Sequence, residues 1–159
     1  MKRLLSFIAA AVFVGCCQGC DQGYEQVGDA CLAFHLGSAY NWTEADVVCS
    51  EQYGGVLAKV TSASDLRAIY EYIITYGLTD SFWLGGSDLL AEGDWVWLAD
   101  SSRVSKATPF WALANGLFGY IHEPSGGQEE NCLLLDKKKK YFFNDEDCGA
   151  YHHLICMQM

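Results

Sequence analysis

Basic residues and proline are scarce in this chain, and no apolar run is long enough to cross a membrane. The 159 residues include 10 Lys and Arg against 20 Asp and Glu, and only 2 prolines. An acidic surface repels the phosphate backbone, which argues against nucleic acid as a partner. The apolar run from Leu4 to Val14 is much shorter than the roughly 20 residues that span a bilayer. We therefore expect no membrane span.

The residue patterns of common enzymes are also missing. No serine has the context of a nucleophile elbow, and His152-His153 has no further Cys or His at zinc spacing. Glu123 and Glu130 could in principle form the acid and base of a glycosidase. The same two carboxylates suit a metal site equally well, and a metal-bound carboxylate is a poor proton carrier. We therefore expect that the protein is not an enzyme.

Residues 1–19 have the order of a secretory signal peptide. Lys2-Arg3 precedes the apolar run, and small residues follow it up to Gly19. Val14-Gly15-Cys16 also resembles a bacterial lipid-attachment box, a second and weaker interpretation. We predict a secreted, extracellular protein. Loss of the two basic residues at its start leaves eight basic against 20 acidic residues, a net charge of about −12.

Six cysteines would remain after removal of residues 1–19, which contain Cys16 and Cys17 of the eight in the chain. An even number of cysteines in an oxidising compartment predicts a disulfide framework. Six cysteines allow 15 pairings, and their spacing does not choose among them.

The hydrophobic pattern predicts one domain of the α+β class at residues 20–159. Helical spacing is found in residues 42–53 and again from Thr61 or Ser62 to about Tyr76, with glycines after both segments. Short strands are expected at 56–60, 82–86 and 95–97. Residues 99–119 have little periodicity and are predicted to form a long irregular loop. Three tryptophans in the strands are expected in the core: Trp83, Trp95 and Trp97.

Oxygen-bearing side chains gather between residues 123 and 145. They are two glutamates, an aspartate, an asparagine and a serine: Glu123, Ser125, Glu130, Asn144 and Asp145. None is a sulfur or imidazole ligand. Oxygen donors of this kind bind calcium, which takes about six to eight of them at roughly 2.3–2.6 Å.

These motifs resemble the carbohydrate-recognition domain of C-type lectins. The matching residues are Glu123-Pro124, Glu130-x-Cys132 and Asn144-Asp145-x-x-Cys148, in this order, and the resemblance extends from about Cys20 to Cys156. It implies a cis Pro124 and a Ca²⁺ ion held by the five oxygen-bearing residues. It also implies that two sugar hydroxyls complete the coordination and bind Glu123, Ser125, Glu130 and Asn144.

The resemblance also implies a fold and its disulfides. The fold would contain two helices, small antiparallel sheets and a long calcium-binding loop. The long form of the family pairs Cys49 with Cys156 and Cys132 with Cys148, with an extra bridge between Cys20 and Cys31. Phe143 replaces the usual tryptophan at a position that serves packing.

Several positions depart from the family pattern. Ser125 is neither the Asn of mannose binders nor the Asp of galactose binders, so the type of sugar does not carry over. Asp88 and Glu92 match ligands of an auxiliary calcium ion, to which Asn131 would also belong. Gly126 and Asn131 stand where carboxylates are usual, and solvated turn carboxylates are the competing interpretation of Asp88 and Glu92.

Three further features have two interpretations each. The run Lys137 to Lys140, at a predicted hairpin tip, is either a solvated turn or a contact for anionic surfaces. Asn41-Trp42-Thr43 is an N-glycosylation sequon, although Trp42 is expected to pack at the start of a helix. Phe118, Tyr120 and His122 either pack within the loop or lie beside the ligand.

We predict a calcium-dependent lectin that binds carbohydrate, either mannose-type glycans or microbial polysaccharides, in innate defence. One small domain gains useful avidity only when clustered, so a homo-oligomer is one expected arrangement. The alternative is a domain that kept the fold, lost sugar binding and acts on proteins or anionic surfaces. Ser125 is the feature that favours this alternative.

Overall fold

A computed structural model describes residues 19–106, 110–116 and 119–159. The predicted signal segment, except Gly19, and Phe118 lie outside these ranges. Among the described residues, no helix is long and apolar enough to cross a membrane.

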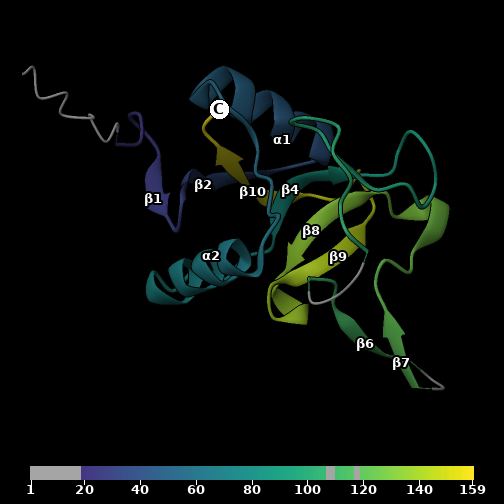
Figure 1. Cartoon of the computed structure of the whole chain (residues 1–159). Coiled ribbons are helices and arrows are strands. Elements are labelled where there is room, and N and C mark those ends of the chain that lie inside the picture. The colour runs from purple at the N-terminus through teal and green to yellow at the C-terminus, as the bar shows by residue number, and fades with distance from the viewer. Residues whose placement is uncertain (1–18, 107–109, 117–118) are drawn as a thin grey trace, which may run out of the picture.

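A sheet of eight strands forms the centre of the molecule (Figure 1). Its strands are β1 Glu25–Val27, β2 Ala30–Tyr40, β3 Val56–Leu57, β4 Phe82–Ser87, β5 Val96–Trp97, β8 Cys132–Asp136, β9 Phe142–Glu146 and β10 His152–Met157. The main order is β1-β2-β10-β4-β8-β9, with β3 paired to β10 and β5 to β4. The neighbours are antiparallel as expected, apart from β10 and β4, which run parallel. Most strands therefore join one larger sheet rather than several small ones.

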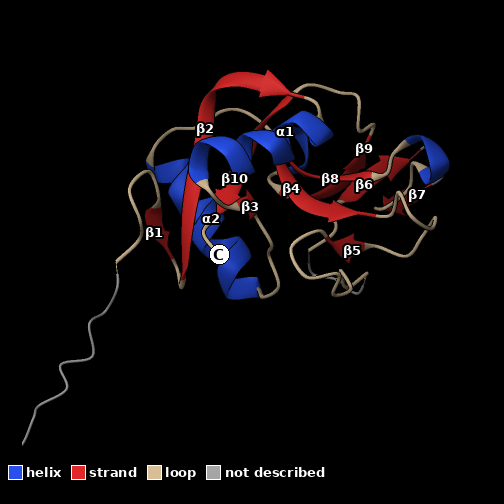
Figure 2. Ribbon diagram, turned by 90° about the horizontal axis from the view of Figure 1, so that it is seen from above, coloured by secondary structure: helices blue, strands red, loops and turns tan. Residues whose placement is uncertain are grey.

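Two α-helices pack against this sheet (Figure 2). Helix α1 (Trp42–Val48) begins at Asn41, whose side chain accepts from the Glu44 amide at 2.9 Å. Helix α2 (Ala63–Thr75) is capped by Ser62 in the same way. The Ser62 hydroxyl accepts from the Asp65 amide, and the Asp65 carboxylate accepts from the Ser62 amide. Both starts are capping boxes, which satisfy free amides at a helix N-terminus. The predicted helix over 42–53 is interrupted, because a π-helical segment (η1, Cys49–Tyr53) replaces its last turns.

Side chains alternate between the two faces of the sheet along each strand, and both faces are covered by a hydrophobic core. Leu133 and Leu135 of β8 belong to the core that includes Ile69 and Ile73 of α2. Leu134 points the other way, into the core shared with Trp42 of α1. This arrangement explains why β8 is a continuous apolar run rather than an alternating one. The predicted burial of Trp83, Trp95 and Trp97 is confirmed.

Three disulfides link the described residues, in the pairing that the resemblance implied. They join Cys20 to Cys31, Cys49 to Cys156 and Cys132 to Cys148, at sequence separations of 11, 107 and 16. Near the first bridge the Asp21 amide donates to the Gln158 side chain at 2.9 Å, which ties the start of the described chain to its C-terminal segment. The second and third bridges pack in the core shared with α1.

The prediction of an entirely irregular loop over 99–119 is wrong. Residues Leu113–Gly116 (β6) pair with Gly119–His122 (β7) as an antiparallel hairpin, which projects from the sheet in Figure 1. The described side chains of this hairpin give no hydrophobic signal for it, because Leu113, Tyr120 and Ile121 are exposed. Its strands are held by backbone pairing, which any sequence without proline permits.

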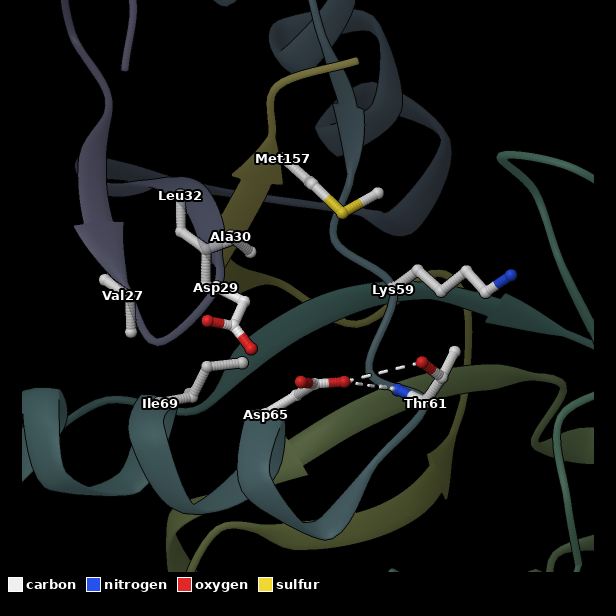
Figure 3. A pocket seen from close by; sticks show the side chains of 9 residues that line it. All are labelled: Val27, Asp29, Ala30, Leu32, Lys59, Thr61, Asp65, Ile69 and Met157. Carbon is white, nitrogen blue, oxygen red and sulfur yellow. Dashed lines mark hydrogen bonds between the residues drawn. The ribbon is translucent and has the colours of Figure 1, made fainter. Parts of the chain in front are cut away.

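A hollow of about 220 Å³ lies between the turn joining β1 to β2 and helix α2 (Figure 3). Two of its polar groups have partners: Asp65 accepts from the Thr61 amide and hydroxyl, and Lys59 pairs with Asp100 at 2.6 Å. None of the predicted site residues lines this hollow.

Candidate functional site

The long loop returns to the sheet beside β9, and this return brings the predicted site residues together. The Ala112 amide donates to the Phe143 carbonyl at 2.9 Å, and the Glu123 amide donates to the Ala112 carbonyl at 3.1 Å. Glu123 therefore follows β7 directly and lies next to the strand that carries Asn144 and Asp145. The Glu123–Pro124 peptide bond is cis, as the resemblance implied.

Three packed aromatic side chains, the aromatic base, support the place where the long loop meets β9. Trp111 meets Trp95 and Phe143 edge to face, with ring centroids 5.0 and 5.7 Å apart. Its indole nitrogen donates to the Ser105 carbonyl at 2.9 Å. Phe143 is buried, in agreement with the packing role expected for it. The aromatic base thus holds the residues on either side of it, Ala112 and Asn144, in fixed positions.

Four polar side chains in and around this junction are almost completely buried. Their exposed fractions are 5% for Glu123, 6% for Asn144, 1% for Asp145 and 2% for Asp88. One oxygen on each of the three carboxylates has no hydrogen-bond partner: Glu123 Oε2, Asp145 Oδ1 and Asp88 Oδ1. Because buried polar atoms are normally paired, such oxygens indicate a place for a proton or a cation.

The carboxylates influence each other's protonation. Burial raises the pKa of Asp145 to about 6, and the nearby Glu123 contributes in the same direction. Burial also raises the pKa of Glu130, helped by the charges of Asp145 and Glu146. Burial also raises the pKa of Glu123, but hydrogen bonds from Lys139 and the Ser125 hydroxyl outweigh this effect. The pKa of Glu123 is therefore lowered.

Sequence analysis did not place Lys139 in this site. Its ammonium group donates to Glu123 Oε1 and to Asn144 Oδ1, so it bridges two of the predicted metal ligands. The prediction of a solvated lysine turn is therefore wrong for this one residue, whereas Lys137, Lys138 and Lys140 are exposed. A signal was available: a group of buried carboxylates needs a positive charge, and these lysines form the only basic run nearby in sequence.

The remaining predicted ligands line a hollow that shares Asp145 with this junction; Glu123 and Asn144 do not line it. Ser125, Glu130 and Asp145 line this hollow of about 220 Å³, together with Asp88 and Glu92 of the predicted auxiliary site. The Gly126 amide donates to Asp145 Oδ2. A Cβ at Gly126 would lie 2.3 Å from the Glu130 Cβ, so the close approach of Glu130 requires glycine here.

The auxiliary constellation is only partly assembled. Asp88 is buried and accepts from the Gly93 amide at 2.8 Å, and Glu92 is exposed. The Asn131 side chain turns away and donates to the Gln128 carbonyl at 2.9 Å. Lys106 also lines this hollow.

The predicted glycosylation site, Asn41, lies elsewhere in the fold. Its side chain caps helix α1, and its glycosylation stays a prediction.

The donor chemistry suits calcium, on one condition. Within the described ranges, no group of three or more His, Cys, Asp or Glu side chains is arranged to hold a metal ion. The oxygen set instead combines carboxylates with an amide and a hydroxyl, and two of its oxygens face Lys139. The residues fit a calcium ion once the Lys139 ammonium has left Glu123 and Asn144.

The chain matches a known protein family. The model of the "Lectin C-type domain" matches residues 38–158. A perlucin-like protein from Mytilus galloprovincialis is 28% identical over 136 residues, which cover 82% of this chain and 77% of that protein. The galactose-specific lectin nattectin from Thalassophryne nattereri is 31% identical over 104 residues, covering 61% of this chain and 64% of nattectin.

Solved structures agree on the fold. The carbohydrate-recognition domain of the mouse scavenger receptor C-type lectin superimposes with a TM-score of 0.69 at 24% identity. The alignment covers 87% of this chain and 95% of that domain. Together with the family match over residues 38–158, these likenesses show that the chain belongs to the C-type lectin domain family.

Proposed function

We propose that residues 20–159 form a secreted lectin that binds carbohydrate through calcium, after loss of the signal segment 1–19. One observation carries this proposal: the long loop and β9 bring Glu123, Asn144 and Asp145 together in a buried place where two carboxylate oxygens lack a donor. Such a place suits a cation with several oxygen ligands.

Five residues would hold the calcium ion: Glu123, Ser125, Glu130, Asn144 and Asp145. Bound calcium would supply a centre whose coordination two neighbouring sugar hydroxyls complete. Glu123, Ser125, Glu130 and Asn144 would also bind those hydroxyls, the carboxylates as acceptors and the Asn144 amide as a donor. Asp88 and Glu92 are proposed as ligands of an auxiliary ion, to which Asn131 contributes only if its side chain turns back. The activity proposed is binding, with no catalysis.

The ligand class we propose is a microbial surface glycan, bound in innate defence. Ser125 is exposed and has a short side chain, which opens the site beside Glu123. Mannose-type and galactose-type sugars are both test ligands, because the relative nattectin is named as galactose-specific. Tyr120, 77% exposed on β7, offers an aromatic face on the same loop.

A glycan array tests this proposal. Wild-type protein is expected to bind in millimolar calcium and to lose binding in a chelator. Glu123→Gln and Asn144→Ala should lose at least about tenfold in signal, which corresponds to about 1.4 kcal/mol. Glu51→Gln, a matched change at an exposed position of η1, should bind as wild type does. Binding that survives both the chelator and Asn144→Ala would reject a calcium-bridged sugar site.

A second candidate function is favoured by Lys139. Its ammonium group already bridges Glu123 and Asn144 without a metal. In this alternative the domain keeps the fold and binds a protein or an anionic surface without calcium, through the exposed Lys137, Lys138 and Lys140. Array binding that resists the chelator but falls with rising salt would favour it.

A further inference from the structure

The turn between β8 and β9 holds its lysines in a defined conformation. Residues Lys137–Lys139 form a short 3₁₀ helix (η3). The Asp136 side chain accepts from the Lys138 amide at 2.9 Å, and the Ser81 hydroxyl accepts from the Lys137 amide at 3.1 Å. The Tyr141 amide closes the turn on the Asp136 carbonyl at 2.8 Å. The backbone that carries Lys139 is therefore held by side chains and by the sheet.

Lys139 differs from the other lysines of this turn in what its side chain meets. It is 25% exposed, and its partner Glu123 is 3% exposed. An ion pair buried to this extent is screened little by water, so each charge depends on the other. Asn144 Oδ1 accepts from the same ammonium group. Lys139 thus meets two buried oxygens that the proposed calcium shell also needs.

We propose that Lys139 is a tethered cation that competes with calcium for Glu123 and Asn144 and thereby sets the calcium affinity of the site. This inference rests on the proposed metal site but not on sugar binding. An ammonium group in contact with both oxygens and a calcium ion on the same oxygens would lie within a few ångströms and repel strongly in a buried place. Calcium therefore enters only when the lysine side chain swings out.

The competition has a measurable consequence. When only a fraction of the molecules is competent to bind, the apparent dissociation constant rises by the inverse of that fraction. A lysine that occupies the site nine-tenths of the time would weaken calcium binding about tenfold. In the absence of calcium the same lysine neutralises part of the carboxylate charge, so it also keeps Glu123 and Asn144 in place.

Calcium titration by calorimetry, with Lys139→Met beside Lys138→Met, tests this inference. Both variants remove one positive charge from the same turn, but only Lys139 contacts the site. Lys139→Met is expected to bind calcium at least about tenfold more tightly than wild type, and Lys138→Met within about twofold. In chelator, Lys139→Met should melt at a lower temperature than Lys138→Met, and this difference should vanish or reverse in saturating calcium.

Lys139→Arg is the control for a folding defect, because it changes the same residue but keeps a positive charge there. It should fold as wild type does and bind calcium no more tightly. Equal calcium affinity in wild type and Lys139→Met would overturn the inference, as would the absence of calcium binding in both. If the affinities change as expected but no variant binds a glycan on the array, the inference stands and the proposed sugar binding fails.

Discussion

The two ends of this molecule are held together by different forces. The body, made of β1–β4, β10 and both helices, is held by apolar cores on both faces of the sheet and by two disulfides. The described part of residues 99–131, the long-loop region, carries the exposed Leu113 and Tyr120 and packs Trp111 and Glu123 against β9, where the aromatic base and the buried polar cluster lie. The described part of the body is held by packing and disulfides, whereas the polar cluster places Glu123 and Asp145 close together, with the Lys139 ammonium group on Glu123.

The largest expected effect comes from the disulfides and compares a bridge of the body with the bridge between β8 and the chain that follows β9. The Cys49–Cys156 bridge closes a separation of 107 residues and Cys132–Cys148 one of 16. In the chain-entropy model such loops contribute about 4.7 and about 3 kcal/mol respectively. Cys49→Ala with Cys156→Ala should therefore destabilise the whole fold more than Cys132→Ala with Cys148→Ala. Urea denaturation of both double variants measures this, and equal losses would contradict the model.

The next effect concerns the aromatic base of the long-loop region. Trp111→Ala should cost about 3 kcal/mol, the lower end for such truncations, because an outer loop can collapse onto the gap. Calcium affinity should fall with it, since Ala112 and Phe143 position Glu123 and Asn144. Leu90→Ala, at a side chain that is 93% exposed, is the control and should change stability by less than about 0.5 kcal/mol. Unchanged calcium binding in Trp111→Ala would show that the aromatic base does not position Glu123 and Asn144.

The smallest effect is a pH dependence in the body. Burial lowers the pKa of His152, against the upward pull of Glu146 and Asp136, while Lys138 and His153 act downward. A lowered pKa in the folded state means that the unfolded chain binds the proton first. The stability due to neutral His152 is therefore present above about pH 6.5 and is lost as pH falls through the lower pKa of the folded state.

His152→Gln should remove this part of the pH dependence. Between pH 7 and pH 5 wild type should lose stability faster than the variant, by at most about 1.4 kcal/mol per pH unit. His122→Gln, at an exposed position of β7, is the matched control and should follow wild type. Parallel urea curves for wild type and His152→Gln at both pH values would show that burial of His152 has no such effect.

Sequence reasoning located most of the body and of the oxygen set. Helical spacing and the caps at Asn41 and Ser62 predict α1 and α2, because these signals act within a few residues. The π-helical end of the first helix and the β6–β7 hairpin were missed. Local pattern carries no information on a widened helical turn. The described apolar side chains of the hairpin, Leu113, Tyr120 and Ile121, are exposed and so follow no hydrophobic alternation.

What the sequence by itself determined is the inventory: an acidic chain with six paired cysteines after residue 19, two capped helices, apolar strands and five oxygen-bearing residues typical of one family. Only the tertiary structure decided which groups meet. The pairing of β8 with β9 places Lys139 beside Asn144, and the return of the long loop to β9 brings Glu123 to the same ammonium group. Charge interactions act through space, so a lysine that looks solvated in the sequence becomes the cation of the site once the sheet has formed.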